Sequence, residues 1–225
     1  MSEVELDEKG NIIIKAILIG NGGVGKTSLI KVVNNECFNE YEETTSEFSY
    51  KQKYIKVGKQ GYCLNLWDTI GQEKLRALTK QFFRDSKIVI FVYDITTENS
   101  FNDLKLWEKD IKENLGENII KGVVGNKKDL FMKEEVSEEK GEQYANEINA
   151  QFKLVSAKSE PKGFEAMLED LLKDYINKEK GIDIKKNKKN KLKKSKENGK
   201  KKKCCWLLLL YYFVKISIYI IYYLI

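Results

Sequence analysis

Residues 20–28 of the 225-residue chain read GNGGVGKTS, a pattern that can bind the phosphates of a nucleotide. The glycines let backbone N–H groups turn inward around a β-phosphate, and a helix that starts here would add its partial positive charge. Lys26 would reach the β- and γ-phosphates, and the Thr27 hydroxyl would bind Mg²⁺. A chance glycine-rich turn is the alternative, but the stretch follows a strand-like run and precedes a helix-like one. The pattern predicts as ligands Gly22, Gly23, Val24, Gly25, Lys26, Thr27 and Ser28.

A second motif, GNKKD at 125–129, can select the base of that nucleotide. The Asp129 carboxylate can accept hydrogen bonds from N1–H and the exocyclic N2–H of guanine, whereas adenine offers no such pair of donors. The aliphatic stem of Lys127 can cover one face of the base. Asn126 can tie this loop to the phosphate loop.

A third motif, SAK at 156–158, follows the next predicted strand. The Ala157 N–H can donate to the guanine O6, and Ser156 and Lys158 complete the predicted base site. Each short motif is weak alone, but all three follow strands, at the sheet edge where such folds bind ligands. An ATP-dependent kinase or ATPase would share only the first motif, so the order of the three predicts a guanine nucleotide.

The stretch WDTIGQE at 67–73 supplies groups for the γ-phosphate and its hydrolysis. Asp68 would hold Mg²⁺ through a water molecule, and the Gly71 N–H would sense the γ-phosphate. Gln72 would orient the attacking water as the catalytic residue.

An acidic stretch, FNEYEETTSEF at 38–48, contains the remaining predicted metal ligand. Thr45 lies 19 residues after Lys26, and its hydroxyl can bind Mg²⁺ when the γ-phosphate is present; Thr44 is the competing candidate. Two loops whose order depends on one phosphate would form a switch.

These motifs must be positioned by the strands and helices between them. Short apolar runs and helical periodicity alternate along the chain, which predicts an α/β domain with a mostly parallel sheet and one hairpin. The predicted strands are 12–20, 50–57, 62–68, 87–95, 118–126 and 151–157, and the predicted helices are 26–34, 101–115, 136–148 and 163–178.

Charge is distributed unevenly along the chain. The net charge is +6, yet residues 178–203 hold fourteen lysines and three acidic residues, and the first 177 residues are acidic overall. A nucleic-acid binder would place basic residues on its folded surface as well, so we expect no nucleic-acid partner. Residues 179–203 are predicted to be a disordered polybasic linker, held near an anionic membrane surface.

Taken together, residues 10–178 resemble the Ras superfamily of small GTPases and, within it, the Rab family. Beyond the nucleotide motifs, the likeness is carried by LNLWDTIGQE (64–73), EKLRALTKQFFR (73–84), VYDIT (92–96) and SFNDLKLWEKDI (100–111).

The resemblance implies a Ras-like P-loop domain over residues 11–178, with a six-stranded sheet flanked by helices, after a short extension at 1–10. It implies a monomer that binds GTP or GDP with Mg²⁺, hydrolyses GTP, and recruits effectors at the cytoplasmic face of an endomembrane to regulate vesicle trafficking. Implied partners are an exchange factor, a GTPase-activating protein, effectors, and escort and GDP-dissociation-inhibitor proteins. By the same likeness Phe38 packs against the guanine edge; a core aromatic is the alternative.

Two departures from the Rab pattern bear on activity. SEFSY at 46–50 replaces a more apolar, glycine-containing stretch that effectors read, and Ile70 stands where alanine is usual. Gly22 leaves room for the Gln72 geometry, so we expect slow hydrolysis that an activating protein accelerates. Ile70 supports the alternative, a nucleotide-binding scaffold that hydrolyses weakly or not at all.

The end of the chain supports two hypotheses about attachment. Cys204 and Cys205 resemble the prenylated end of a Rab protein, but an apolar stretch, 206–225, follows them. Its twenty residues match a hydrocarbon core of about 30 Å, so it could be a C-terminal anchor. Its A/T-encodable composition favours the other hypothesis, an extension of the gene model beyond the lipid-bearing cysteines.

Overall fold

The computed structural model describes residues 5–42, 45, 48–69 and 79–181. Strands and helices alternate over this part of the chain, as predicted. In chain order the elements are β1 (Ile12–Ile19), α1 (Lys26–Val33), β2 (Ser49–Val57), β3 (Gln60–Asp68), η2 (Lys80–Phe82), β4 (Ile88–Asp94), α3 (Glu98–Asn102), α4 (Leu104–Leu115), β5 (Ile120–Asn126), η3 (Lys128–Lys133), α5 (Glu138–Glu147) and β6 (Gln151–Leu154), followed by a helix over residues 161–181.

The six strands form one sheet in the order β2-β3-β1-β4-β5-β6. Every neighbouring pair is parallel except β2 and β3, which form an antiparallel hairpin through a turn at Gly58 (φ 63°). The predicted fold, a Ras-like domain with a six-stranded, mostly parallel sheet, is confirmed. The carboxyl ends of the parallel strands meet at one edge, and the loops of the three nucleotide motifs start there.

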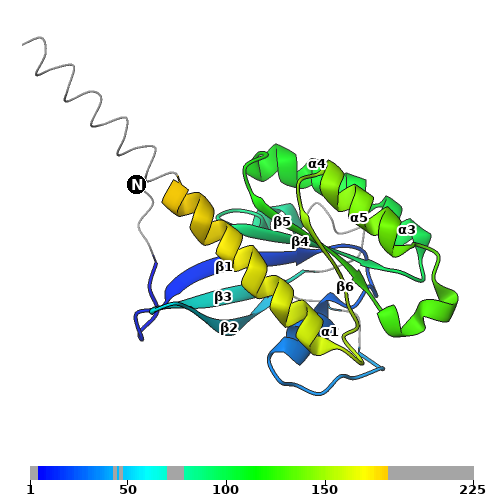
Figure 1. The fold of residues 1–225 in the computed structure, drawn as a ribbon, viewed down its shortest axis with the longest axis horizontal. Helices are drawn as coiled ribbons and strands as arrows, with labels where there is room; N and C mark the ends of the chain where they lie inside the picture. Colours follow the sequence, from blue (N-terminus) through cyan, green and yellow to red (C-terminus); the bar gives the residue numbers. More distant parts are fainter. Residues whose placement is uncertain (1–4, 43–44, 46–47, 70–78, 182–225) are drawn as a thin grey trace, which may run out of the picture. The chain divides into compact units, whose positions relative to one another are not determined.

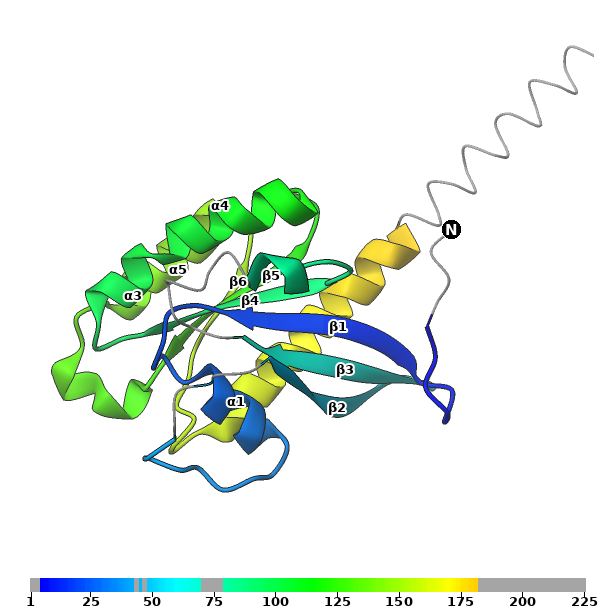
Figure 2. The same cartoon turned by 180° about the vertical axis from the view of Figure 1, so that it is seen from behind.

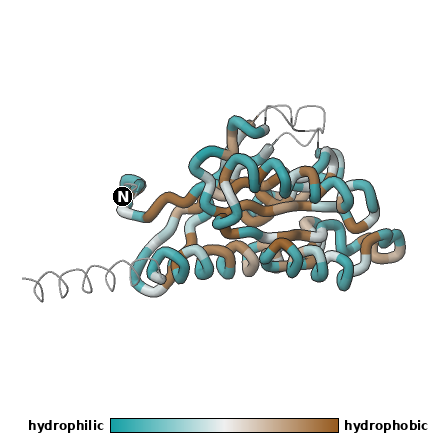
Figure 3. Tube along the Cα trace, turned by 90° about the horizontal axis from the view of Figure 1, so that it is seen from above, coloured by the Kyte–Doolittle hydropathy of each residue, from teal (hydrophilic) through white to brown (hydrophobic). Residues whose placement is uncertain are grey.

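Helices cover both faces of the sheet (Figures 1 and 2). Helix α1 and the yellow helix over residues 161–176 enclose one core, and α3, α4 and α5 enclose the other. The central strand β4 is buried at all seven positions, because it packs against helices on both sides. Figure 3 shows the apolar strands between helices whose outer surfaces are polar.

Local sequence signals account for several element boundaries. Ser137 caps α5, its hydroxyl accepting from the Lys140 N–H at 3.3 Å. The helix predicted over 101–115 is two helices that meet at Asp103. The last helix spans 161–181, a few residues longer at each end than predicted; residues 177–181 belong to a second compact unit and are helical.

Several predictions lie outside the described residues. They concern Thr44, Ile70, Gly71, Gln72, Cys204, Cys205, residues 1–4, the linker beyond residue 181 and the apolar stretch 206–225. In the part of the chain that the structure describes, no helix has the length and apolar character needed to cross a membrane.

Candidate functional site

The phosphate loop joins β1 to α1 and is held at both ends. At its start, Gly20 (φ 146°) lies against β4 so closely that a Cβ would come within 2.1 Å of the Val92 carbonyl oxygen. At its end, Gly25 (φ 94°) precedes α1, and a Cβ there would lie 2.3 Å from Asn126 Nδ2. Only glycine fits both positions, since each combines a positive φ with a close neighbour.

Lys26 is the first residue of α1 and is 5% exposed. Its ammonium donates to the carbonyl oxygens of Gly20 (2.9 Å) and Asn21 (2.8 Å). Burial lowers the pKa of Lys26 to about 8, and the nearby Asp68 carboxylate partly opposes this shift. The fold therefore holds a desolvated cation beside the loop, where nucleotide phosphates would compensate its charge.

The lowered pKa predicts a pH dependence for protein stripped of nucleotide. The pKa of Lys26 is about 8 in the folded protein and 10.5 in an unfolded chain. At pH values between these two, the unfolded chain therefore binds more protons than the folded chain. The free energy of unfolding should therefore rise as the pH passes from below 8 to above 10.5, by up to roughly 3 kcal/mol from this group. NMR titration of ¹⁵N-labelled lysine ammonium groups, with Lys26→Met to assign the signal, measures the pKa directly; a pKa near 10.5 would contradict the prediction.

The two predicted base-reading loops lie against each other and against the phosphate loop. Asn126 joins them: its Nδ2 donates to the Val24 carbonyl oxygen (2.9 Å), and its Oδ1 accepts from the Ala157 N–H (3.2 Å). The buried Ser156 hydroxyl donates to Asp129 Oδ1 at 2.5 Å. These contacts orient the Asp129 carboxylate.

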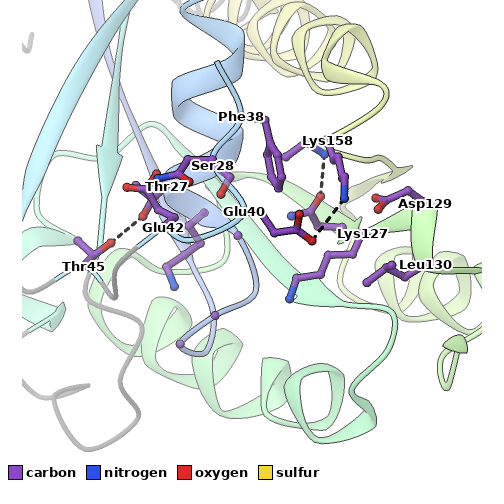
Figure 4. A pocket seen from close by; sticks show the side chains of 17 residues that line it. Thr27, Ser28, Phe38, Glu40, Glu42, Thr45, Lys127, Asp129, Leu130 and Lys158 are labelled. Carbon is purple, nitrogen blue, oxygen red and sulfur yellow. Dashed lines mark hydrogen bonds and ion pairs between the residues drawn. The ribbon is translucent and has the colours of Figure 1, made fainter. Parts of the chain in front are cut away.

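A cavity of about 350 Å³ runs between these loops and the segment after α1 (Figure 4). This volume is in the range of small-molecule sites. Of the predicted residues it is lined by Gly22, Gly23, Gly25, Lys26, Thr27, Ser28, Phe38, Thr45, Asn126, Lys127, Asp129, Ala157 and Lys158. Phe38 is 36% exposed at its wall and is not a core aromatic.

Some residues of the site were not predicted from the sequence. Asp94, at the end of β4, forms an ion pair with Lys127 (2.7 Å) and so fixes the lysine expected to cover the base. Glu40 reaches Lys158 across the cavity (3.4 Å), and Glu42 pairs with Lys31 (2.5 Å). Leu130 adds apolar lining next to Asp129. In the sequence, only the contacts of Glu40 and Glu42 had a visible signal, which is the acidic run at 40–43.

The three predicted metal ligands lie together: Thr27 and Thr45 line the cavity, and Asp68 lies beside them without lining it. The hydroxyl oxygens of Thr27 and Thr45 lie 2.6 Å apart (Figure 4). Burial raises the pKa of Asp68, opposed by the Thr27 hydroxyl, the Lys26 charge and the Thr45 hydroxyl. The buried Asp68 Oδ1 has no hydrogen-bond partner within the described part of the chain.

This donor set fits Mg²⁺. Hydroxyl and carboxylate oxygens suit a hard cation, which keeps its own waters and is completed by substrate phosphates. No group of three acidic, histidine or cysteine side chains in the described ranges could hold a metal by itself. The residues therefore suit an ion that arrives with a nucleotide, and bound Mg²⁺ would neutralise phosphate charge there.

The fold and the cavity define a P-loop nucleotide-binding domain whose base site suits guanine. Comparison with known proteins agrees: the Ras family model matches residues 15–177. Ras-related protein Rab-21 of Homo sapiens is 41% identical over 162 residues, covering 72% of each chain. The same protein of Geodia cydonium is 37% identical over 175 residues (78% of this chain, 76% of the relative), and Ras-related protein Rab-8B of Homo sapiens is 35% identical over 166 (74% and 80%). The chain belongs to the Ras family and is a Rab-type small GTPase.

Proposed function

We propose that this protein is a GTP-binding and GTP-hydrolysing switch that regulates vesicle trafficking by recruiting effectors to a membrane in its GTP state. The observation that carries the proposal is the single cavity, which gathers a guanine-reading carboxylate, a buried lysine and two threonine hydroxyls. Base, phosphates and Mg²⁺ would thus be bound side by side. Hydrolysis is slow without an activating protein.

The Thr27–Thr45 contact supports the switch. Thr27 belongs to α1, whereas Thr45 lies in the segment between α1 and β2. A bound Mg²⁺ with a γ-phosphate would draw both hydroxyls to one ion, and loss of that phosphate would release Thr45. The segment would then change its order with the nucleotide.

An aromatic cluster near Thr45 supports effector recruitment. Phe48 stacks on Phe82 with ring centroids 3.7 Å apart, and Tyr50 stacks on Trp67 at 5.0 Å. Tyr50 is 49% exposed, and the other three rings are partly exposed. Partly exposed aromatic side chains are typical anchors for protein partners. Because Phe48 follows Thr45 by only three residues in the chain, the shape of the cluster would depend on the bound nucleotide.

Membrane attachment is part of the proposal and rests on the sequence. The lysine-rich stretch at 179–203 would bind anionic lipids, and either prenyl groups on Cys204 and Cys205 or the apolar stretch 206–225 would anchor the chain. An exchange factor, an activating protein and effectors would act on the membrane-bound monomer; escort and GDP-dissociation-inhibitor proteins would act on a prenylated form.

Replacing Gln72 by leucine tests hydrolysis. Leucine cannot orient the attacking water, so single-turnover release of phosphate from γ-³²P-labelled GTP should fall by about 10-fold or more from a slow wild-type rate on the order of 10⁻⁴ s⁻¹. GDP affinity should stay unchanged, because Gln72 acts only on the γ-phosphate side. Equal rates for the two proteins would favour a non-hydrolysing nucleotide-bound scaffold.

A further inference from the structure

Asn21 is the second residue of the phosphate loop. Its side chain is hydrogen-bonded to residues of α4, which packs on the face of the sheet opposite to α1. Its Nδ2 donates to Asp103 Oδ2 (2.6 Å), and its Oδ1 accepts from Trp107 Nε1 (3.2 Å). Both partners lie at the start of α4, more than eighty residues later in the chain. The loop leads into α1 on one face of the sheet, whereas α4 packs on the other (Figure 1).

The partners allow the amide only one orientation. A carboxylate can only accept and an indole nitrogen can only donate, so a flipped amide would lose both bonds. Trp107 itself has little freedom to move, because it is 1% exposed and packs in the core between the sheet and the helices α3, α4 and α5. Asp103 makes no side-chain cap to its own helix; its carboxylate is directed to Asn21 instead.

The main chain of Asn21 is bonded to the phosphate-binding machinery. Its carbonyl oxygen accepts from Lys26 Nζ at 2.8 Å. One residue is therefore fixed to α4 through its side chain and to the buried ammonium through its backbone. A shift of Asn21 would move the start of the loop and one of the two carbonyl oxygens that hold Lys26.

We propose that Asn21 is a positioning residue for the phosphate loop, and that the start of α4 sets the lifetime of bound nucleotide through it. Asp103 and Trp107 hold the loop in the conformation that presents Lys26 to the phosphates. The inference rests on the proposed binding of guanine nucleotides. It gives α4 a part in nucleotide release although α4 does not line the cavity.

Exchanging the side chains of Asn21 and Asp103 tests the proposal. Asn21→Asp places two carboxylates together, so release of a fluorescent GDP analogue from full-length protein should quicken by about 10-fold or more. The double variant Asn21→Asp/Asp103→Asn restores a donor–acceptor pair with its polarity reversed. Its release rate should return to within about threefold of wild type, as expected for a directly coupled pair.

A matched control is Asn114→Asp. Asn114 also lies on α4, near its C-terminal end, and its Nδ2 donates to the Asp110 carbonyl oxygen (2.7 Å) within the same helix. Its release rate should match wild type. Thermal unfolding after removal of nucleotide separates positioning from folding: all variants should unfold within a few degrees of wild type, since a partly exposed polar contact contributes little to stability.

Three results would overturn the inference while leaving nucleotide binding intact. These are wild-type release from Asn21→Asp, fast release from the double variant, and a fall in the unfolding temperature that tracks the release rate. Absence of GDP binding to the wild-type chain would instead remove the proposed function, and the inference with it.

Discussion

Replacing Lys26 by methionine is expected to change stability and nucleotide affinity in opposite directions. The buried ammonium, whose pKa falls to about 8, destabilises the fold without a ligand by roughly 3 kcal/mol at neutral pH. Methionine fills a similar volume without a charge, so protein stripped of nucleotide should gain roughly 1–3 kcal/mol in its free energy of unfolding. GDP affinity should fall by about 100-fold or more, because the charge-assisted bonds to the phosphates are lost.

Urea denaturation with and without GDP measures both effects on one protein. In the wild type GDP should raise the free energy of unfolding, whereas in Lys26→Met it should add little at the same concentration. Lys59→Met is the matched control, since Lys59 is exposed at the β2–β3 turn, away from the cavity. A stripped Lys26→Met protein less stable than wild type would show that the buried ammonium stabilises the fold.

Replacing Asp129 by asparagine is expected to change the base that the protein selects. The carboxylate can accept from both N1–H and N2–H of guanine, whereas an asparagine amide offers one acceptor and one donor. Xanthine has a carbonyl in place of the 2-amino group, so it pairs with that amide. GDP affinity should fall by about 100-fold or more, since a site built for one hydrogen-bond pattern strongly rejects another, and xanthosine diphosphate should bind in its place.

Competition against a fluorescent GDP analogue, with GDP, xanthosine diphosphate and ADP as competitors, measures this change. Asp85→Asn is the matched control, because Asp85 is exposed and its positive φ (63°) is one that asparagine tolerates. ADP should compete poorly with every variant. Unchanged preference for GDP in Asp129→Asn would show that another group reads the base.

The sequence by itself determined the fold class and the chemistry of the site. Phosphate binding depends on residues next to each other in the chain, so the run from Gly20 to Ser28 could be interpreted from backbone geometry alone. Strands buried on both faces and an amphipathic last helix predicted the layered α/β domain. The sequence determined the ends of helices and strands less well. The break between α3 and α4 at Asp103, for example, lies within one continuous helical pattern.

The tertiary structure alone decided which distant side chains meet outside the nucleotide motifs. Asn21 with Asp103 and Trp107, and Lys127 with Asp94, are separated in sequence and carry no shared motif. These pairings depend on how the strands lie in the sheet and how α4 packs on it, and neither follows from local spacing. The lowered pKa of Lys26 has the same origin, because desolvation is produced by the whole packed domain and not by neighbours in the chain.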